Sequence, residues 1–207
     1  MLLNRNENAH QELMRKSIQS WISDPDARLL KATDANDQVI GWSCWITKEA
    51  QQSETTTGTE SKPENETVRE GAAPEELSKR KAEPPQDPAR ALGGLMFKDR
   101  VAWEEKYLKG KRYAVLQGLA TDPLYQRRGI GTKLVQQGLE EIDAEGLPCW
   151  IHASPSSYKL YEKAGFQEVG RNDYDLDEWA PGGKNGNRGW GRYTFRHMLR
   201  PARTATI

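Results

Sequence analysis

The sequence has few of the features that mark secreted or membrane-spanning proteins. Its two cysteines, Cys44 and Cys149, each lie inside a short apolar run, which argues against a disulfide framework and favours buried free thiols. No apolar run approaches the roughly 18 residues that a membrane span requires, and the N-terminus lacks the apolar segment of a signal peptide. We therefore expect no membrane partner and a cytoplasmic protein, with the nucleus as the alternative location.

A net charge is also lacking, because 30 lysines and arginines balance 30 aspartates and glutamates. Zero net charge and the absence of a recognition motif argue against a nucleic-acid partner. After Glu178 the chain nevertheless carries six basic residues and no acidic one, which we interpret as a solvated strand face rather than a phosphate-binding arm. These residues are Lys184, Arg188, Arg192, Arg196, Arg200 and Arg203.

Residues 49–90 lack the side chains that build a core. They contain no aromatic residue, and Val68 and Leu77 are their only large aliphatic residues. Such a segment cannot bury enough apolar surface to offset the entropy lost on ordering. We therefore predict one domain over residues 1–207 that contains a disordered, low-complexity insertion at 49–90.

The rest of the chain is organised around residues 113–133, YAVLQGLATDPLYQRRGIGTK. The apolar run over 113–121 predicts a buried strand, and a loop containing Gly129 and Gly131 then opens a helix. The first amides of a helix have no partner within it, and the helix dipole adds partial positive charge, so this loop is a candidate anion site. Three basic side chains strengthen it: Arg127, Arg128 and Lys133.

The glycines do not fit the two best-known phosphate loops. A P-loop has lysine directly after its last glycine, whereas Thr132 separates Gly131 from Lys133. A dinucleotide fingerprint has a third glycine where Leu134 stands. Neither a P-loop nor a dinucleotide site is therefore predicted.

Two other segments carry a family resemblance at matching spacing. QRRGIG over 126–131 resembles the acetyl-CoA pyrophosphate loop of the GNAT superfamily of N-acetyltransferases, and YEKAGF over 161–166 resembles the YxxxGF segment of that family. The resemblance implies direct transfer of an acetyl group from acetyl-CoA to an amine of a small molecule or peptide, by a monomer or homodimer without a metal. A catalytically silent CoA-binding or protein-interaction module of the same fold is the alternative.

Alternating helices and strands predict an α/β (α+β) domain with three layers, αβα. The patterns place helices at 9–22, 95–109, 130–145 and 154–164, and strands at 28–33, 39–47, 113–121, 148–153, 166–174 and 190–199. The resemblance implies a mixed, mostly antiparallel sheet that splays between the parallel strands 113–121 and 148–153, with a bulge in the former. The family normally begins with a further strand and helix, so either the first strand is missing or Met1–Asn6 takes its place.

The resemblance assigns most cofactor contacts to main-chain groups. By motif alignment the Leu119 N–H would polarise the acetyl carbonyl, and Thr121 would pair with the pantetheine amide. Ser154 stands where the family often has asparagine, and Ser157 is equally suited to capping a helix. The predicted cofactor-binding residues are Leu119, Ala120, Thr121, Gln126, Arg127, Arg128, Gly129, Ile130, Gly131, Thr132, Ser154, Ser157 and Tyr161.

The predicted catalytic groups are Tyr161, His152 and the amide of Leu119. Tyr161 holds the family's general-acid position, and a phenol with the ordinary pKa near 10 stays protonated at neutral pH. A tyrosine at the edge of the core is its structural alternative.

His152 is the one titratable residue on strand 148–153. Its ordinary pKa near 6.5 suits a base, and alternation places it on one face with Trp150 and Ser154, although a histidine in a strand is more often structural. Further candidates for the base, an ammonium anchor or the acceptor wall lie in the last hairpin: Asp173, Asp175, Asp177, Glu178, Trp179 and Trp190.

Overall fold

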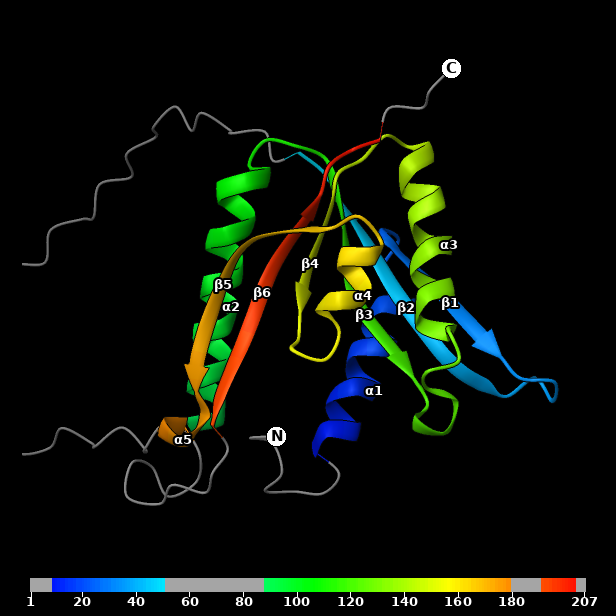
Figure 1. Ribbon diagram of the computed structural model, residues 1–207, viewed down its shortest axis with the longest axis horizontal. Helices are drawn as coiled ribbons and strands as arrows, with labels where there is room; N and C mark the ends of the chain where they lie inside the picture. Colours follow the sequence, from blue (N-terminus) through cyan, green and yellow to red (C-terminus); the bar gives the residue numbers. More distant parts are fainter. Residues whose placement is uncertain (1–8, 51–87, 180–190, 204–207) are drawn as a thin grey trace, which may run out of the picture.

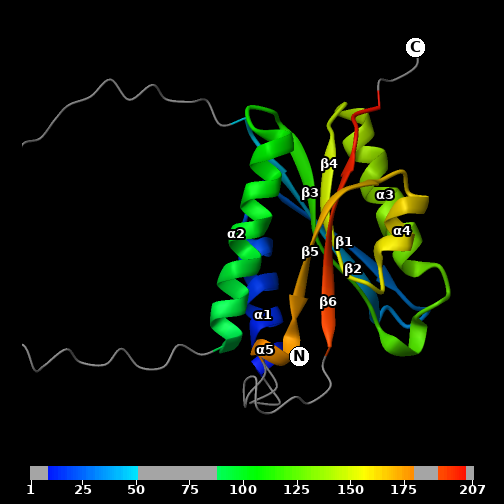
Figure 2. The same ribbon diagram turned by 60° about the vertical axis from the view of Figure 1, so that its left-hand side comes forward.

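The computed structural model describes residues 9–50, 88–179 and 191–203. In chain order its elements are α1 (Ala9–Ile22), β1 (Ala27–Thr33), β2 (Val39–Lys48), α2 (Pro88–Leu108), β3 (Tyr113–Thr121), η1 (Pro123–Tyr125), α3 (Ile130–Ala144), β4 (Cys149–Ala153), α4 (Tyr158–Lys163), β5 (Gln167–Asp175), α5 (Leu176–Trp179) and β6 (Arg192–Arg200). Within the described residues the six strands form one sheet, in the order β1-β2-β3-β4-β6-β5. Helices α1 and α2 cover one face, and α3 and α4 cover the other (Figure 1 and Figure 2). The predicted αβα layering is confirmed.

The sheet is antiparallel except between β3 and β4. These two strands pair only where Ala114 meets Cys149 and Val115 meets Trp150, close to their N-terminal ends. Beyond that point they diverge, and their C-terminal ends lie apart in Figure 1. The expected splay is confirmed, and it leaves main-chain groups of both strands without a partner from the neighbouring strand.

A bulge interrupts β3 shortly after the splay begins. Cys44 of β2 pairs with Gly118, whereas the next residue, Trp45, pairs with Leu116. Gln117 is therefore the extra residue on β3, and the strand bends at this point. The bulge implied by the family resemblance is confirmed.

The main apolar core lies between the sheet and the α3–α4 layer. The buried large residues of α3 lie on one face of the helix: Leu134, Val135, Leu139 and Ile142. Gly146 follows the helix with φ of +64°, a left-handed value that suits a helix end. Cys44 and Cys149 are both buried free thiols, as expected.

Some predicted boundaries and environments differ from the structure. Helix α2 begins at Pro88 rather than at residue 95, because proline is well suited to the first turn of a helix, so the end of the predicted insertion is helical. The single turn α5 was not predicted. Met1–Asn6, residues 51–87 and Trp190 lie outside the described residues.

The interpretation of the basic C-terminal residues as a solvated face is wrong for Arg200. Its side chain is 3% exposed, and its guanidinium donates to both carboxylate oxygens of Asp143, at 2.5 and 2.7 Å. Arg196 is also partly covered, because its guanidinium lies 4.1 Å from the ring centroid of Tyr158. Packing across β6 buries these cations, which the composition of the tail could not indicate.

Across the described ranges, no helix has both the length and the apolar character needed to cross a bilayer. The same residues contain no group of three or more His, Cys, Asp and Glu side chains placed to hold a metal ion.

Candidate functional site

The glycine loop joins the C-terminal end of β3 to the N-terminus of α3. Gly129 is the N-cap residue with φ of +81°, and Arg127 has φ of +62°, a value that is uncommon for a residue with a side chain. The side chain of Gln126 fastens the loop to β3, since its Nε2 donates to the Thr121 carbonyl at 3.1 Å. No side chain of the described residues caps α3 at this end, so its first amides are free to bind an anion.

Gly131 leaves room between α3, α4 and the end of β3. A Cβ at this position would lie 3.5 Å from Leu160, 3.7 Å from the Thr121 hydroxyl and 3.8 Å from Leu119. These are ordinary contact distances, and the described residues do not by themselves require a glycine here. A glycine in such a place suits a ligand that approaches the backbone closely. This test favours a fit between the loop and an extended phosphate-bearing ligand.

The polar side chains of the loop face outward. Arg127, Arg128 and Thr132 are all exposed. The Arg128 guanidinium lies 5.1 Å from the ring centroid of Tyr125, whose hydroxyl donates to Asp34 at 3.1 Å. The main chain of the loop is therefore its principal anion-binding feature, with Arg128 anchored beside it.

Tyr161 lies on α4 and is 5% exposed. Burial raises the pKa of its phenol to about 12, and a hydrogen bond with Ser157 acts in the opposite direction. Ser157 occupies the N-cap position of α4 without making a cap hydrogen bond, and its hydroxyl lies 2.8 Å from that of Ser154. The structure thus joins three predicted site residues in one chain of hydroxyl groups. Tyr161 stays protonated well above neutral pH.

His152 lies on the opposite face of the sheet, under α2. Its Nε2 accepts a hydrogen bond from the Trp150 indole at 2.7 Å, and its ring stacks on Phe195 at 5.6 Å between centroids. Burial is the main cause that lowers its pKa to about 2, and His197, Arg100 and Lys48 lower it further. The expectation of an ordinary pKa near 6.5 is therefore wrong, and His152 is neutral at physiological pH.

The expected alternation does not extend to Ser154, because β4 ends at Ala153 and the chain turns there. Trp150 and His152 contact each other, whereas Ser154 bonds to the hydroxyls of Ser156 and Ser157 at the start of α4. The site therefore groups Ser154 with Tyr161 and not with His152.

Glu104 is a buried polar residue that the sequence reasoning missed. Its side chain is 7% exposed, and its Oε1 lies 3.5 Å from His152 Nε2. Its Oε2 accepts from Lys48 Nζ at 2.5 Å and from the Tyr113 hydroxyl at 3.0 Å. The available signal was its spacing: Glu104 is three residues after Val101 and four before Leu108, within the inward-facing stripe of α2.

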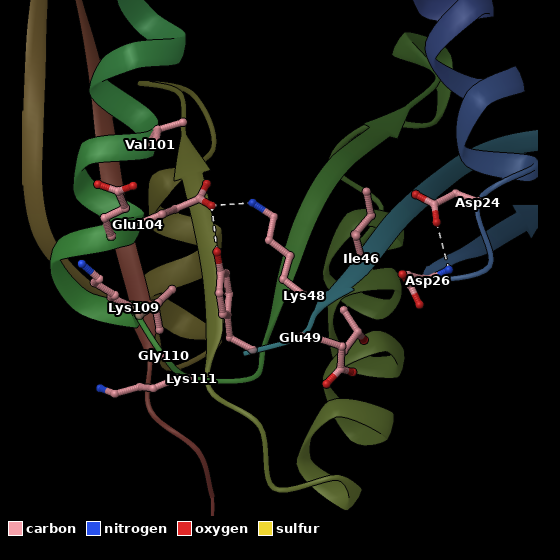
Figure 3. A pocket seen from close by; sticks show the side chains of 14 residues that line it. Asp24, Asp26, Ile46, Lys48, Glu49, Val101, Glu104, Lys109, Gly110 and Lys111 are labelled. Atoms are coloured by element: carbon pink, nitrogen blue, oxygen red, sulfur yellow. Dashed lines mark hydrogen bonds and ion pairs between the residues drawn. The ribbon is translucent and has the colours of Figure 1, made fainter. Parts of the chain in front are cut away.

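Two cavities of the described residues lie at the N-terminal end of β3, away from the glycine loop. The larger, about 490 Å³, is bordered by the end of α2 and by Lys48 and Tyr113 (Figure 3). The smaller, about 260 Å³, includes Arg112 and Trp45. Neither contains a residue of the glycine loop. The evidence for a binding site at the glycine loop is therefore its backbone conformation and not a closed cavity.

Residues 85–166 match the family model described as "Acetyltransferase (GNAT) family". The matched range runs from just before α2 to Phe166 and so contains the splayed strands, the glycine loop and Tyr161. This part of the chain is therefore similar to GNAT acetyltransferases.

Two similar curated proteins are both named [Ribosomal protein bS18]-alanine N-acetyltransferase, one from Salmonella typhimurium and one from Escherichia coli strain K12. Each is 36% identical to this chain over 67 residues, which make up 30% of this chain and 45% of the relative. The match thus spans less than half the length of these relatives.

A similar solved structure is that of a protein named arylalkylamine N-acetyltransferase 7 from the yellow fever mosquito. The TM-score is 0.56 at 17% sequence identity, over 95% of this chain and 72% of that one. At this level of identity the likeness shows a shared fold and nothing about the acceptor.

Proposed function

We propose that the protein is an N-acetyltransferase that transfers an acetyl group from acetyl-CoA to a primary amine of a small molecule or peptide. The observation that carries the proposal is the uncapped N-terminus of α3, with Arg127 and Gly129 in left-handed conformations, directly beside the splay between β3 and β4. The match of residues 85–166 to the GNAT acetyltransferase family supports the choice of acetyl-CoA over other phosphate-bearing ligands. The free, buried thiols of Cys44 and Cys149 fit a reducing compartment, so we place the reaction in the cytoplasm.

The roles proposed for the cofactor-binding residues rest on the family resemblance, and the splay of β3 from β4 and the uncapped start of α3 support them. Acetyl-CoA would supply the thioester that the amine attacks. The amides from Arg127 to Thr132 would hold the diphosphate, with Gln126 keeping the loop against β3. The main chain over Leu119–Thr121, past the bulge, would bind the pantetheine arm, and the Leu119 amide would stabilise the charge that develops on the acetyl oxygen.

Tyr161 is the proposed proton donor to the departing sulfur. Its high pKa keeps the proton in place until a strongly basic thiolate forms, and the hydroxyls of Ser157 and Ser154 connect it toward the end of β4. His152 is proposed as a neutral polar wall on the acceptor side, because its buried imidazole is a poor proton acceptor.

Calorimetric titration with acetyl-CoA tests the loop, using Gly131→Ala against a matched control, Gly94→Ala. The added methyl at 131 fits the free protein at ordinary contact distance but fills the space beside the amides. We expect affinity to fall at least tenfold for Gly131→Ala. Gly94 is an exposed helix residue with nothing within 4 Å of a Cβ, so its variant should bind like the unaltered protein. Absence of acetyl-CoA binding in the unaltered protein, or full affinity in Gly131→Ala, would contradict the proposal.

The second measurement separates an enzyme from a silent CoA-binding module. Tyr161→Phe keeps the buried ring but removes the proton, so we expect kcat on a responsive amine to fall about a hundredfold with unchanged acetyl-CoA affinity. An unchanged kcat would remove Tyr161 from the mechanism. Tight CoA binding without turnover across a panel of amines would favour the silent module instead.

A further inference from the structure

The larger cavity lies between the end of α2, the end of β2 and the turn that joins α1 to β1 (Figure 3). Its volume of about 490 Å³ is in the range of small-molecule sites. Five carboxylates and three lysines line it, and Ile46, Val101 and Leu108 provide an apolar wall. The surplus of carboxylates favours a cation, and the wall favours one with an apolar body.

The floor of the cavity holds a carboxylate and an aromatic ring in contact. Glu104 is 6% exposed and Tyr113 is 9% exposed, and the Tyr113 hydroxyl donates to Glu104 Oε2 at 3.0 Å. Glu104 Oε1 is buried and accepts no hydrogen bond from the described residues. A carboxylate next to an aromatic ring is a favourable environment for an organic ammonium ion.

An alkylammonium group from the chain itself already occupies this position. Lys48 Nζ lies 2.5 Å from Glu104 Oε2 and 5.6 Å from the centre of the Tyr113 ring. Figure 3 shows the Lys48 side chain reaching from β2 across to α2. Its side chain is 37% exposed, whereas that of Glu104 is 7% exposed, so the ammonium can move into water but the carboxylate cannot.

We propose that this cavity binds a small organic ammonium ion, a protonated primary amine with an apolar body, on Glu104 and Tyr113 in place of the Lys48 ammonium. Two other neighbours of Glu104 lie beside its inner oxygen Oε1: the charged Arg100, with Nε at 3.8 Å, and the neutral His152, with Nε2 at 3.5 Å. Arg100 keeps a cation beside the carboxylate when Lys48 leaves.

This site is separate from the loop proposed to bind the diphosphate of acetyl-CoA. Tyr113 is the first and Thr121 the last residue of β3, and a nine-residue strand separates its ends by about 26 Å. Ligand binding at Glu104 is therefore independent of the glycine loop and can be measured without acetyl-CoA.

The test is calorimetric or NMR titration of the full chain with 2-phenylethylammonium, and with 2-phenylethanol as the uncharged probe. We expect the ammonium ion to bind and the alcohol not to bind. Glu104→Gln removes the anion and should weaken binding at least tenfold. Lys48→Met removes the internal competitor and should strengthen it about tenfold. Lys109→Met is the matched control: it removes the same charge from the cavity without a contact to Glu104, and should change affinity less than threefold.

Stronger binding by Lys48→Met together with weaker binding by Glu104→Gln supports the site. If the ion pair is purely structural, neither variant should change the affinity for the ammonium ion. Equal effects of Lys48→Met and Lys109→Met, undiminished binding by Glu104→Gln, or equal binding of the alcohol would overturn the proposal. Because Lys48→Met uncovers a buried carboxylate, Lys48→Gln, which keeps a donor for Glu104, provides a second variant, and its affinity should also rise. A negative result in this titration would not contradict acetyl-CoA binding, and a protein without acetyltransferase activity could still bind the ammonium ion.

Discussion

The two faces of the sheet bury different kinds of side chain. The face under α3 and α4 is an apolar cluster that includes Trp45, Leu116 and Phe166. The face under α2 buries Glu104 and His197 among aromatic rings. We propose that the cofactor binds on the apolar face through main-chain amides, whereas the polar face offers ionisable side chains. In this proposal, one sheet separates recognition by the backbone from recognition by side chains.

The polar face is ordered by a hydrogen-bond network between α2 and the β5–β6 pair. Asn172 Oδ1 lies 2.9 Å from Trp103 Nε1 and 2.8 Å from His197 Nε2, and its Nδ2 donates to Asp99 at 3.1 Å. Because Asn172 Oδ1 can only accept, His197 carries its proton on Nε2. Its Nδ1 is then a buried lone pair without a hydrogen-bond partner among the described residues. This arrangement requires a neutral imidazole.

The largest effect that we predict from the difference between the two faces is a loss of stability at acidic pH, caused by the histidines of the polar face. Burial lowers the pKa of His197 to about 4 and that of His152 to about 2, from 6.5. Below pH 6.5 the unfolded chain binds protons that the folded chain excludes, so stability falls as pH falls. At roughly 1.4 kcal/mol per pH unit and histidine, about 5 kcal/mol is lost between pH 7 and 4.5. Urea unfolding at several pH values measures this loss.

The matched variant is His152→Gln, which keeps an acceptor for the Trp150 indole. Its free energy of unfolding should fall about half as steeply between pH 6.5 and 4.5, whatever its value at pH 7. A slope equal to that of the unaltered protein would show that His152 is protonated in the folded state. The polar face would then not require a neutral histidine at position 152.

A second prediction compares one tight glycine contact on each face. A Cβ on Gly138 would lie 2.2 Å from the Trp45 ring, and a Cβ on Gly170 would lie 2.2 Å from the Trp103 ring. Trp45 is 3% exposed and bonded to Ser43, so it cannot move aside. Gly138→Ala should therefore cost about 3 kcal/mol, even after the gain in helix propensity.

Gly170→Ala should cost less, about 2 kcal/mol, because Trp103 is only partly buried and can tilt toward solvent. A tilt of Trp103 should also weaken its hydrogen bond to Asn172. The stability of Gly170→Ala should therefore depend less on pH than that of the unaltered protein. Thermal and urea unfolding of both variants measure the difference. Equal costs would mean that the two faces are packed with the same rigidity.

The sequence was sufficient where local pattern decides the structure. The strand over 113–121, the helix that follows the loop and the loop with Gly129 and Gly131 follow from local pattern and glycine placement, and the structure confirms these elements. It was insufficient where burial comes from distant segments. His152 is neutral because α2 and β6 cover it, Glu104 meets Lys48 across 56 positions, and Arg200 is buried against Asp143. A charge pattern along the chain does not reveal such pairs.

The smallest predicted effect concerns the ion pair that closes the edge of the apolar face. The Arg200 guanidinium, by hydrogen bonding to Asp143, holds the pKa of that carboxyl below its ordinary 3.8. The folded state therefore favours the ionised carboxylate, and the pair stabilises the protein above about pH 4 and ceases to do so as pH falls further. Since Asp143 is 26% exposed, we expect Asp143→Asn to cost only about 1.5 kcal/mol at pH 7.

The pH at which this cost disappears distinguishes the two faces. Between pH 7 and 4.5 the unfolding curve of Asp143→Asn should run parallel to that of the unaltered protein, because Asp143 does not titrate there, whereas the His152→Gln curve should converge on it. Below pH 4 the Asp143→Asn difference should shrink in turn. A variant that removes a titrating group must change the slope of unfolding free energy against pH in the range where that group binds its proton. If both variants run parallel to the unaltered protein at every pH, neither Asp143 nor His152 causes the acid response of its face.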